Sequence, residues 1–485
     1  MADPSASSRR GEAWVWTALA LLLCVVALFR PVDHDESQYV AAAVLTAHGL
    51  LPYRDYAYLQ TPLQPFLFAP IVWAAGTFAW PALRIANALL GALAIRCVGG
   101  AAREVADARA AAVATGLFGC CDILLFSIGT ARNDALPAAC LAGGLWLAVR
   151  AEREGATRAA AMLAGLLLAA AAAAKVSYAL PAFTYGLWAL YRRGHRPLFV
   201  ALGAVPMLLF VGWTYLLSPE AFVFGVWTFP TQAPLDWYAD RPCKLSLAAK
   251  LFDTLKFLTL GPALLALVAV ARPRPPGLLV VLIAAGMVAA LLPTPTWRQY
   301  LLPLLPPLFV ALACAWGRQP PGRVVRIAAV VFAVAGLAPT TAALVAGKPA
   351  MMAAMRHGDA IRHAMDAADV DADAYVSTLS PQFLPATGRL PDPSLATGPF
   401  AFRSRLSFDE EHATLVLTRR TLDRLNGPAI LVGGEGAWTS GDPALDAALE
   451  RWAVAHLYRR VRIEGTPFLL YLRPPIQYDR PSGPA

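Results

Sequence analysis

The sequence predicts a polytopic α-helical membrane protein that ends in a small α/β domain, and its composition and the spacing of its apolar residues carry this prediction. Of the 485 residues, 58% are hydrophobic and only 15% are charged, which is too apolar for a soluble protein of this length. The apolar residues form blocks of roughly 16 to 23 residues, about the length of a helix that crosses a bilayer. The blocks end near residue 346. We therefore divide the chain into an N-terminal segment (residues 1–12), a transmembrane domain (13–346) and a C-terminal domain (347–485).

About eleven blocks are long and apolar enough to be membrane helices. In chain order they are residues 13–29, 82–102, 110–127, 135–149, 159–174, 176–191, 198–217, 251–271, 278–292, 300–316 and 324–346. A further block, residues 64–79, is interrupted by Pro65 and Pro70 and is predicted to be a re-entrant or interfacial helix. If it does not cross, nearly every arginine cluster lies in a loop on the side of the N-terminus, as the positive-inside rule requires. If it crossed, most of these clusters would be external.

The charge pattern also assigns the two sides of the membrane. With a cytoplasmic N-terminus and about eleven crossings, the first loop (residues 30–81) and the C-terminal domain are extracytoplasmic. The net charge of +9 then reflects arginines in cytoplasmic loops, so nucleic-acid binding is not expected. Frequent Ala, Arg and Pro with little Asn and Lys are typical of a GC-rich bacterium, which predicts the cytoplasmic (inner) membrane as the location.

An acidic cluster directly follows the first predicted span. It reads Asp33-His34-Asp35-Glu36, and a short helix is predicted after it over residues 37–48. Asp33 or Asp35 can cap this helix, because acidic side chains at a helix N-terminus accept its free N–H groups and favour its dipole. Three acids within four residues exceed what a cap needs. The cluster is therefore predicted to be functional.

Polar residues in three other short loops fall on the same predicted side. They are Arg132, Asn133 and Asp134 after the third span, Lys175 between the fifth and sixth, and Trp297, Arg298, Gln299 and Tyr300 at the start of the tenth. Lys175 interrupts an apolar run, where a charge at lipid depth is costly and usually functional. Its side chain could also snorkel to the interface, and Arg298 could be a plain interfacial anchor.

Carboxylates and cations gathered at the outer leaflet suit the transfer of a group from a lipid phosphate to an acceptor hydroxyl. A carboxylate would take the proton of the acceptor, and cations would hold the phosphate as negative charge builds on it. Because a phosphate leaves without being protonated, one base and several cations suffice. If the transferred group is a sugar, the transition state would be oxocarbenium-like.

The same residues resemble those of a known enzyme family. The matching motifs are Asp35-Glu36 with Tyr39, Gly49-Leu50-Leu51-Pro52-Tyr53-Arg54-Asp55, Thr61-Pro62-Leu63, Asp134, Ala174-Lys175 and Arg298-Gln299-Tyr300-Leu301-Leu302-Pro303. In order and spacing they resemble the bacterial protein-mannosyltransferase-like and aminoarabinose-transferase-like branch of the GT-C glycosyltransferases. The resemblance implies a GT-C fold and an inverting transfer of a hexosyl or pentosyl group from a polyprenyl-phosphate-linked sugar. The acceptor would be a hydroxyl of a lipid, glycan or protein.

The resemblance also implies which acidic residues react. Asp35 would be the catalytic base, with Glu36 beside it for acceptor or metal contact. Asp134 would be the second acidic position of the site, and Asp33 is left with the capping role. The family pattern implies no certain cofactor, although Asp35, Glu36 and Asp134 could hold a divalent metal ion.

Cationic and aromatic residues would bind the donor. The resemblance places Lys175 and Arg298 near the donor phosphate, with Tyr300 next to them. The other predicted donor-binding or substrate-binding residues are Tyr39, Arg54 and Gln60. The chain departs from the family pattern at Gln60, where relatives often have His or Lys near this position, and at Gln299, which separates Arg298 from Tyr300.

The C-terminal region has the alternating pattern of a small α/β domain. Helices are predicted over residues 350–368, 419–426 and 444–457, and strands over 374–379, 414–417, 430–433 and 468–472. The domain is expected to lie over the mouth of the active site. No catalytic residue is predicted in it, and its suggested part is acceptor selection.

Two other functional classes remain open at this point. A secondary transporter also has many spans and intramembrane charges, but it would place its polar groups at mid-depth and often shows an internal repeat. Here the polar groups gather at one predicted face, and the two halves show no visible repeat. A non-catalytic lipid-binding or assembly protein of the same fold is not excluded by any residue.

Overall fold

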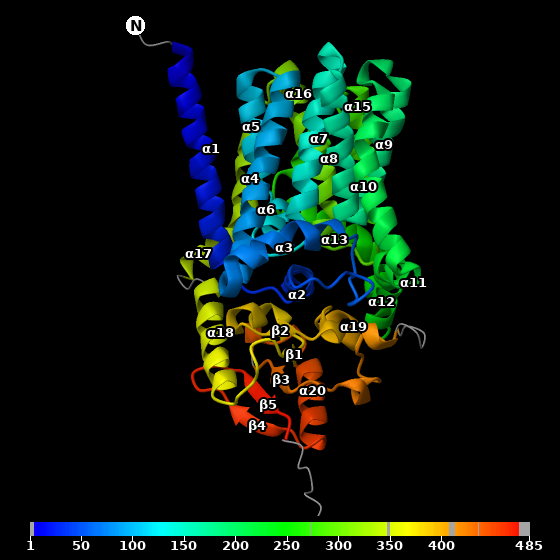
Figure 1. Ribbon diagram of the computed structural model, residues 1–485. Coiled ribbons are helices and arrows are strands. Elements are labelled where there is room, and N and C mark those ends of the chain that lie inside the picture. The colour runs from blue at the N-terminus through cyan, green and yellow to red at the C-terminus, as the bar shows by residue number, and fades with distance from the viewer. Residues whose placement is uncertain (1–3, 273, 347–349, 407–412, 435, 475–485) are drawn as a thin grey trace, which may run out of the picture.

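The computed structural model describes residues 4–272, 274–346, 350–406, 413–434 and 436–474, which form a helical bundle and a small α/β domain stacked end to end (Figure 1). The helices of the bundle part are α1 (Pro4–Phe29), α2 (Glu36–Ala47), α3 (Leu63–Ala75), α4 (Ala79–Val105), α5 (Ala108–Gly119), α6 (Asp122–Ile128), α7 (Ala135–Glu154), α8 (Arg158–Ala174), α9 (Ala179–Tyr191), α10 (Pro197–Leu217), α11 (Pro219–Val223), α12 (Phe229–Trp237), α13 (Leu247–Thr259), α14 (Ala263–Ala269), α15 (Gly277–Leu291), α16 (Leu305–Arg318) and α17 (Arg323–Val345). Each block predicted as a span corresponds to one of these helices or to a bent pair of them. The predicted short helix over residues 37–48 is α2.

The bundle is that of a multi-pass membrane protein. By length and hydropathy, five helices of the described residues can cross a membrane, or seven if each bent pair counts as one span. The shorter apolar helices α8 and α15 stand beside them in the bundle (Figure 1). The predicted helical membrane architecture is therefore confirmed at this level, and the number of about eleven crossings stays a prediction.

The block predicted to be re-entrant or interfacial forms α3 and the 3-10 turn Gly76–Phe78. With α4 it makes an apolar stretch of 43 residues, about twice what one span needs. Figure 1 shows α3 beside α2, at the end of the bundle that faces the C-terminal domain. This placement agrees with an interfacial helix, and whether the segment crosses stays a prediction.

The arginine-rich connections lie at the opposite end, close to the start of α1 (Figure 1). There Arg103 pairs with Glu12 at 2.6 Å and Arg153 pairs with Glu104 at 2.7 Å. The basic loops are thus separated from the first loop and the C-terminal domain by the length of the bundle, as the charge count predicted. That this basic end faces the cytoplasm stays a prediction.

Two bent helix pairs of the described chain meet inside the bundle. The axis turns by 61° between α5 and α6 and by 95° between α13 and α14. The backbone N–H of Asp122, the first residue of α6, donates to the carbonyl of Leu260 at the other break, at 3.1 Å. Gly261 has φ +125° and packs against Cys121, where a Cβ would lie 2.8 Å from the Cys121 Cα. This hydrogen bond therefore pairs a free backbone N–H at one break with a free carbonyl at the other, because unpaired backbone groups are costly in a low-dielectric interior.

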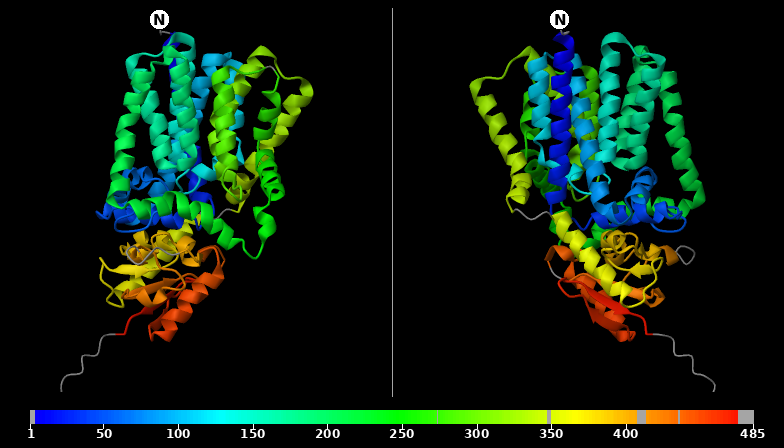
Figure 2. Two further views of the ribbon diagram at one scale, coloured as in Figure 1. Left: turned by 90° about the vertical axis from the view of Figure 1, so that its right-hand side faces the viewer. Right: turned by 60° about the vertical axis from the view of Figure 1, so that its left-hand side comes forward.

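The C-terminal domain is a five-stranded sheet with helices beside it (Figure 2). Its elements are α18 (Ala350–Asp366), β1 (Tyr375–Ser377), β2 (Leu390–Pro391), α19 (Pro399–Arg403), β3 (Ala429–Val432), α20 (Pro443–Ala455), β4 (Arg459–Arg462) and β5 (Leu469–Leu472). The strand order is β2-β1-β3-β5-β4, with β1 parallel to β2 and β3, and β5 antiparallel to β3 and β4.

The sequence prediction of this domain was wrong at two segments and missed two strands. Residues 414–417 are not a strand, because Ala413–Leu415 is a 3-10 turn and the buried side chains after it pack into clusters with α12, α19, α20 and β3. Residues 419–426 hold only the 3-10 turn Leu422–Arg424. The missed strands are β2 and β4, and β4 is an exposed edge strand with three arginines in four residues, which hides the apolar alternation of a strand.

The domain is docked on the start of α2. A side chain at Gly398 would collide with Ser37, and a Cβ at Gly441 would lie 2.7 Å from the His34 ring. Both glycines have positive φ, +58° and +92°, a conformation that favours glycine. The backbone of the domain therefore lies directly against the acidic cluster.

Candidate active site

A cavity of about 600 Å³ lies where the bundle meets the C-terminal domain. Its walls come from the first loop, α6, the loop before α7, α12, α13, the 3-10 helix η6 (Arg298–Leu304) and α19. The charged side chains that line it are Asp33, Asp35, Arg132, Lys175, Arg298 and Arg403. Polar groups from segments far apart in the sequence thus converge on one space, at one end of the bundle.

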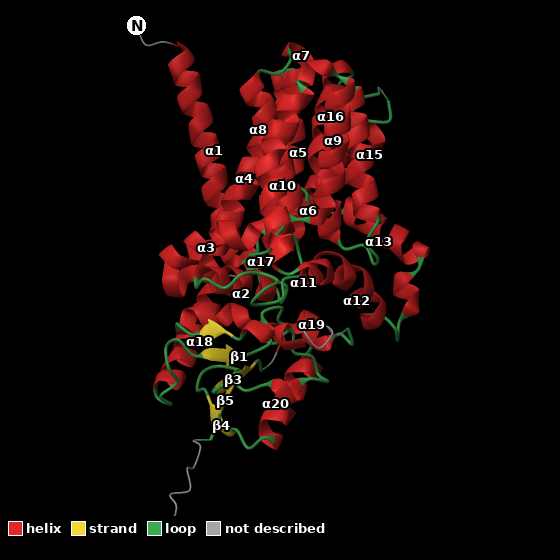
Figure 3. Cartoon of the chain, turned by 45° about the vertical axis from the view of Figure 1, so that its right-hand side comes forward, coloured by secondary structure: helices red, strands yellow, loops and turns green. Residues whose placement is uncertain are grey.

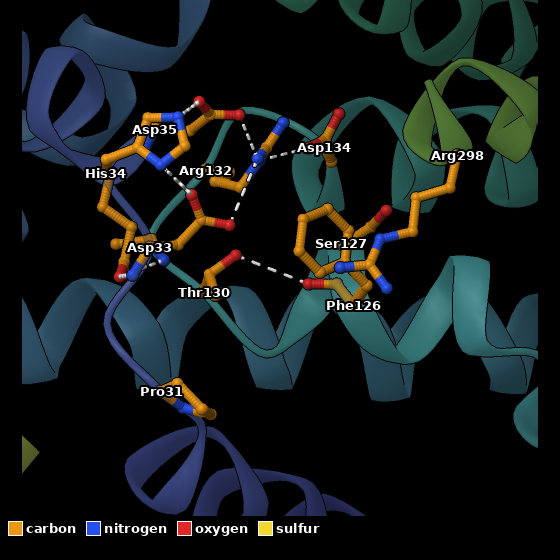
Figure 4. A network of polar contacts seen from close by, with 12 residues as sticks. Pro31, Asp33, His34, Asp35, Phe126, Ser127, Thr130, Arg132, Asp134 and Arg298 are labelled. Atoms are coloured by element: carbon orange, nitrogen blue, oxygen red, sulfur yellow. Dashed lines mark hydrogen bonds and ion pairs between the residues drawn. The ribbon is translucent and has the colours of Figure 1, made fainter. Parts of the chain in front are cut away.

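One buried guanidinium gathers the carboxylates of the site (Figure 4). Arg132, whose side chain is 4% exposed, contacts the Asp35 carboxylate directly and lies 3.4 Å from that of Asp33 and 3.1 Å from that of Asp134. On its other side the Asp35 carboxylate is 3.2 Å from Nε2 of His34. The geometry fixes the position of Asp35 in the wall of the cavity.

Asp33 and Asp35 have pKa values shifted in opposite directions. Burial raises the pKa of Asp35, and the charges of Asp33 and Asp134 add to this effect against the opposing effect of Arg132. Burial also disfavours the charged form of Asp33, but Arg132, His34 and the N–H of Asp35 together outweigh it and lower the pKa of Asp33. Because a carboxylate with a raised pKa is the better proton acceptor, Asp35 has the properties of a general base.

Asp33 lies in the turn that leads into α2. Its Oδ1 accepts the backbone N–H of Asp35 at 2.9 Å, and the Glu36 carboxylate accepts the backbone N–H of Asp33 at 3.1 Å. The N-cap residue of α2 is Asp35, which makes no side-chain capping hydrogen bond, so Asp33 fixes the turn before the helix and does not bind the helix N–H groups as predicted.

The surroundings of Glu36 do not support its predicted contact with acceptor or metal. Glu36 is completely buried and does not line the cavity. Its carboxylate accepts hydrogen bonds from Arg84 Nε at 2.8 Å, Trp80 Nε1 at 3.0 Å and the backbone N–H of Ala131 at 2.7 Å. Arg84 in turn donates to backbone carbonyls at the end of α1. We therefore correct the assignment: Glu36 anchors the first loop to α1, α4 and the loop before α7.

Asp134 positions cations and does not line the cavity. It is 1% exposed, and its two oxygens bind the Lys175 ammonium group and Nε of Arg132. Lys175 is itself buried, with its Nζ 5.7 Å from the centre of the Tyr300 ring. The predicted reactive role of Asp134 is thus corrected to an orienting one. The alternative in which Lys175 snorkels to the interface does not describe this paired, buried side chain.

Arg298 is held by a carboxylate inside the bundle. Its Nη1 donates to Asp122 at 2.8 Å, and its guanidinium lies over the Phe126 ring at 3.4 Å from the centre. Asp122 is completely buried and also faces Arg30 at 3.9 Å. The Arg298 side chain is 28% exposed, so it remains open toward the cavity while its orientation is fixed.

The remaining predicted residues divide into two groups. Tyr39, Gln60 and Tyr300 line the cavity, as the prediction requires. Arg54 does not, because its half-exposed side chain pairs with Asp55 at 2.7 Å on the outside of the first loop. A donor-binding role for Arg54 therefore has no support in the structure.

The predicted metal set does not fit the structure. Glu36 is fully engaged by Arg84, Trp80 and Ala131, and Asp134 by two cations. Among the described residues, Asp33, His34 and Asp35 have ligand atoms within 4.8 Å of one another. The Arg132 guanidinium contacts both of these carboxylates, so a metal ion at this cluster would compete with it for their oxygens.

Several residues of the site were outside the predicted set. Arg132 was noted beside Asp134 but given no role. Asp122 carried a signal, because a carboxylate inside an apolar block is costly without a function. His34 was part of the predicted cluster but was given no role of its own. Arg403 carried no signal, since its place in the cavity depends on how the C-terminal domain docks.

Comparison with known proteins shows the fold. No protein-family model and no curated protein sequence matches the chain. The crystal structure of ArnT from Cupriavidus metallidurans bound to undecaprenyl phosphate is similar, with a TM-score of 0.64 and 18% identity over 96% of this chain and 99% of that one. The apo structure of the same ArnT matches with a TM-score of 0.64 and 15% identity, over 96% of this chain and 100% of that one. The chain therefore has the fold of ArnT, in agreement with its resemblance to the GT-C glycosyltransferases.

Proposed function

We propose that this protein is an inverting glycosyltransferase that moves a hexosyl or pentosyl group from a polyprenyl-phosphate donor to an acceptor hydroxyl. The observation that carries the proposal is that Asp35, the carboxylate with a raised pKa, lines the same cavity as the cations Lys175 and Arg298. A base on one wall and phosphate-binding cations on another are the two parts that such a transfer needs. The reaction would take place at the outer face of the cytoplasmic membrane.

Asp35 acts as the base in this proposal. Its carboxylate accepts the proton of the acceptor hydroxyl while the hydroxyl oxygen attacks the anomeric carbon of the donor. The bond between that carbon and the phosphate oxygen breaks, and its electron pair stays on the phosphate. Because attack and departure occur on opposite faces of the sugar, the configuration is inverted.

Lys175 and Arg298 hold the leaving phosphate. Each is fixed by a buried carboxylate, Asp134 and Asp122 respectively, so little reorganisation is needed when charge develops on the phosphate. Tyr300 lies under the Lys175 ammonium group and Phe126 under the Arg298 guanidinium, which restricts both side chains further. No acid is required, because the departing phosphate is already a stable anion.

Polyprenyl phosphate as the donor carrier has a separate line of support. The ArnT structure with the same fold was solved with undecaprenyl phosphate bound. A carrier of this kind reaches an active site at the end of a membrane bundle directly from the lipid phase. The fold is thus compatible with the donor that the cationic pair suggests.

The test is transfer by the purified protein from a panel of undecaprenyl-phosphate-linked sugars, followed as release of undecaprenyl phosphate. We expect Asp35→Asn to lower kcat by about 10²- to 10⁴-fold, the usual contribution of a general base. Asp55→Asn is the matched control, since Asp55 belongs to the same loop but lies outside the cavity. No release from any donor, or equal activity of wild type and Asp35→Asn, would overturn the proposal.

A further inference from the structure

The C-terminal domain places a partly buried arginine, with an unpartnered Nε, in the wall of the cavity. Arg403 is the last residue of α19 and lines the same space as Asp35. Its Nε is buried and has no hydrogen-bond partner among the described residues. A buried donor without a partner costs free energy in the folded protein, so its presence in a cavity points to a ligand that supplies the acceptor.

Arg403 differs in this respect from the other cations of the cavity. Arg132, Lys175 and Arg298 are each paired with at least one carboxylate. In the described part of the chain Arg403 makes no ion pair, and burial lowers its pKa. Asp35 and Asp442 act on the charge of Arg403 from a distance, but no described carboxylate forms an ion pair with its guanidinium, so its N–H groups can bind an anion directly.

The guanidinium of Arg403 is nevertheless held in place. It lies 3.6 Å from the centre of the Trp237 ring, at the end of α12. The neighbouring Asp236 accepts the backbone N–H of Arg405 at 2.7 Å and the Ser404 hydroxyl at 3.4 Å. Figure 3 shows α12 of the bundle part beside α19 of the domain. The two segments are tied together so that Trp237 supports one face of the guanidinium.

This support leaves the edge of the guanidinium for a ligand. A planar guanidinium stacked on an aromatic ring binds carboxylate or phosphate through its N–H groups, and it presents them in a fixed direction. Phe400, one turn earlier on α19, lies between the Trp237 and His34 rings at 6.1 Å from each. The anion site is therefore connected to the acidic cluster by a continuous aromatic wall.

We propose that Arg403 is an anion-binding residue supplied by the C-terminal domain, and that it holds a phosphate or carboxylate group of the acceptor beside the reacting hydroxyl. The assignment to the acceptor rests on the proposed function, because the donor phosphate already has Lys175 and Arg298. Binding of the anion itself does not rest on it. The C-terminal domain would thus select acceptors by their charge, while the reacting groups Asp35, Lys175 and Arg298 come from the bundle part.

The test measures binding without turnover. The full-length protein in detergent is titrated with inorganic phosphate by calorimetry, with and without saturating undecaprenyl phosphate. The variants are Arg403→Gln, Arg403→Lys and the matched control Arg424→Gln, which removes an exposed arginine of the same domain outside the cavity. Thermal unfolding of each variant is recorded. Arg403→Gln should unfold at most slightly earlier than wild type, because it loses the stacking on Trp237 but no hydrogen bond of Nε.

Three outcomes decide between the possible ligands. The acceptor site is supported if phosphate binds the protein that is saturated with undecaprenyl phosphate and Arg403→Gln weakens this phosphate binding by about tenfold or more. In that case Arg403→Lys should recover part of the binding, and Arg424→Gln should not change it. If Arg403→Gln instead weakens the binding of undecaprenyl phosphate, Arg403 is still an anion-binding residue, but its ligand is the donor. If Arg403→Gln binds both ligands like wild type, the proposal is overturned, whether or not the protein transfers sugar.

Discussion

The pair formed by Glu36 and Arg84 allows a direct test of the different roles assigned to two adjacent acidic residues. Both side chains are completely buried, and Glu36 also accepts hydrogen bonds from Trp80 and from the backbone of Ala131. Removing one partner of such a pair leaves the other charge uncompensated, at a cost of about 3–5 kcal/mol. We therefore expect Glu36→Ala to lower the free energy of unfolding by about this amount.

Asp35→Asn should behave in the opposite way. Because burial raises the folded-state pKa of Asp35, the stabilisation from its protonated form is present at low pH and is lost as the pH rises through that pKa. At pH 7 the ionised Asp35 carboxylate destabilises the folded protein, and a neutral Asn side chain does not. The Asp35→Asn variant should therefore unfold no earlier than wild type, although it loses transfer activity.

The assay is thermal unfolding of the purified variants in one detergent at pH 7, with transfer measured below the unfolding temperature. A double variant, Glu36→Leu with Arg84→Met, should recover part of the loss of Glu36→Ala because no buried charge is left unpaired. A Glu36→Ala protein that unfolds like wild type but no longer transfers sugar would refute the structural assignment of Glu36.

Three further predictions concern the site and the topology. Since the charge of Asp33 raises the pKa of Asp35, Asp33→Asn should move the acidic limb of the pH profile of kcat/KM to lower pH. An acidic limb that stays at the same pH or moves to higher pH would contradict the assignment of the base. EDTA should leave activity unchanged because the Arg132 guanidinium already contacts both carboxylates and competes with a metal ion for them. A loss of activity that Mn²⁺ restores would mean that Asp33, His34 and Asp35 hold an ion. A reporter fused after residue 346 should register as extracytoplasmic, and a cytoplasmic signal would mean that residues 64–79 cross the membrane.

Much of the bundle could be predicted because its signal is local. An apolar block identifies a membrane helix without knowledge of its neighbours, so the predicted blocks coincide with helices. The breaks at α5–α6 and α13–α14 were not predicted, because each is stabilised by the other. The hydrogen bond between Asp122 and Leu260 joins segments more than a hundred residues apart, and no local pattern reports it.

Within the site, the residue types were predictable and the pairings were not. Lys175 was identified because a charge inside an apolar run is costly unless it is used. Asp35 was identified from the excess of acids after the first span and from the family resemblance, and Arg298 from that resemblance. That Lys175 is held by Asp134 and Arg298 by Asp122 depends on how the helices pack. Arg403 could not be found at all, since it reaches the cavity through the docking of a separate domain.

The separation of Asp35 from Glu36 is a consequence of helix geometry. Successive residues of an α-helix are rotated by about 100°, so adjacent side chains at the start of α2 cannot face the same surface. The Asp35 side chain lines the cavity, whereas the Glu36 side chain meets α4, where Arg84 carries the complementary charge. Two adjacent carboxylates that form one motif in the sequence therefore have different roles: Glu36 fixes the start of the helix, and this holds Asp35 against Arg132.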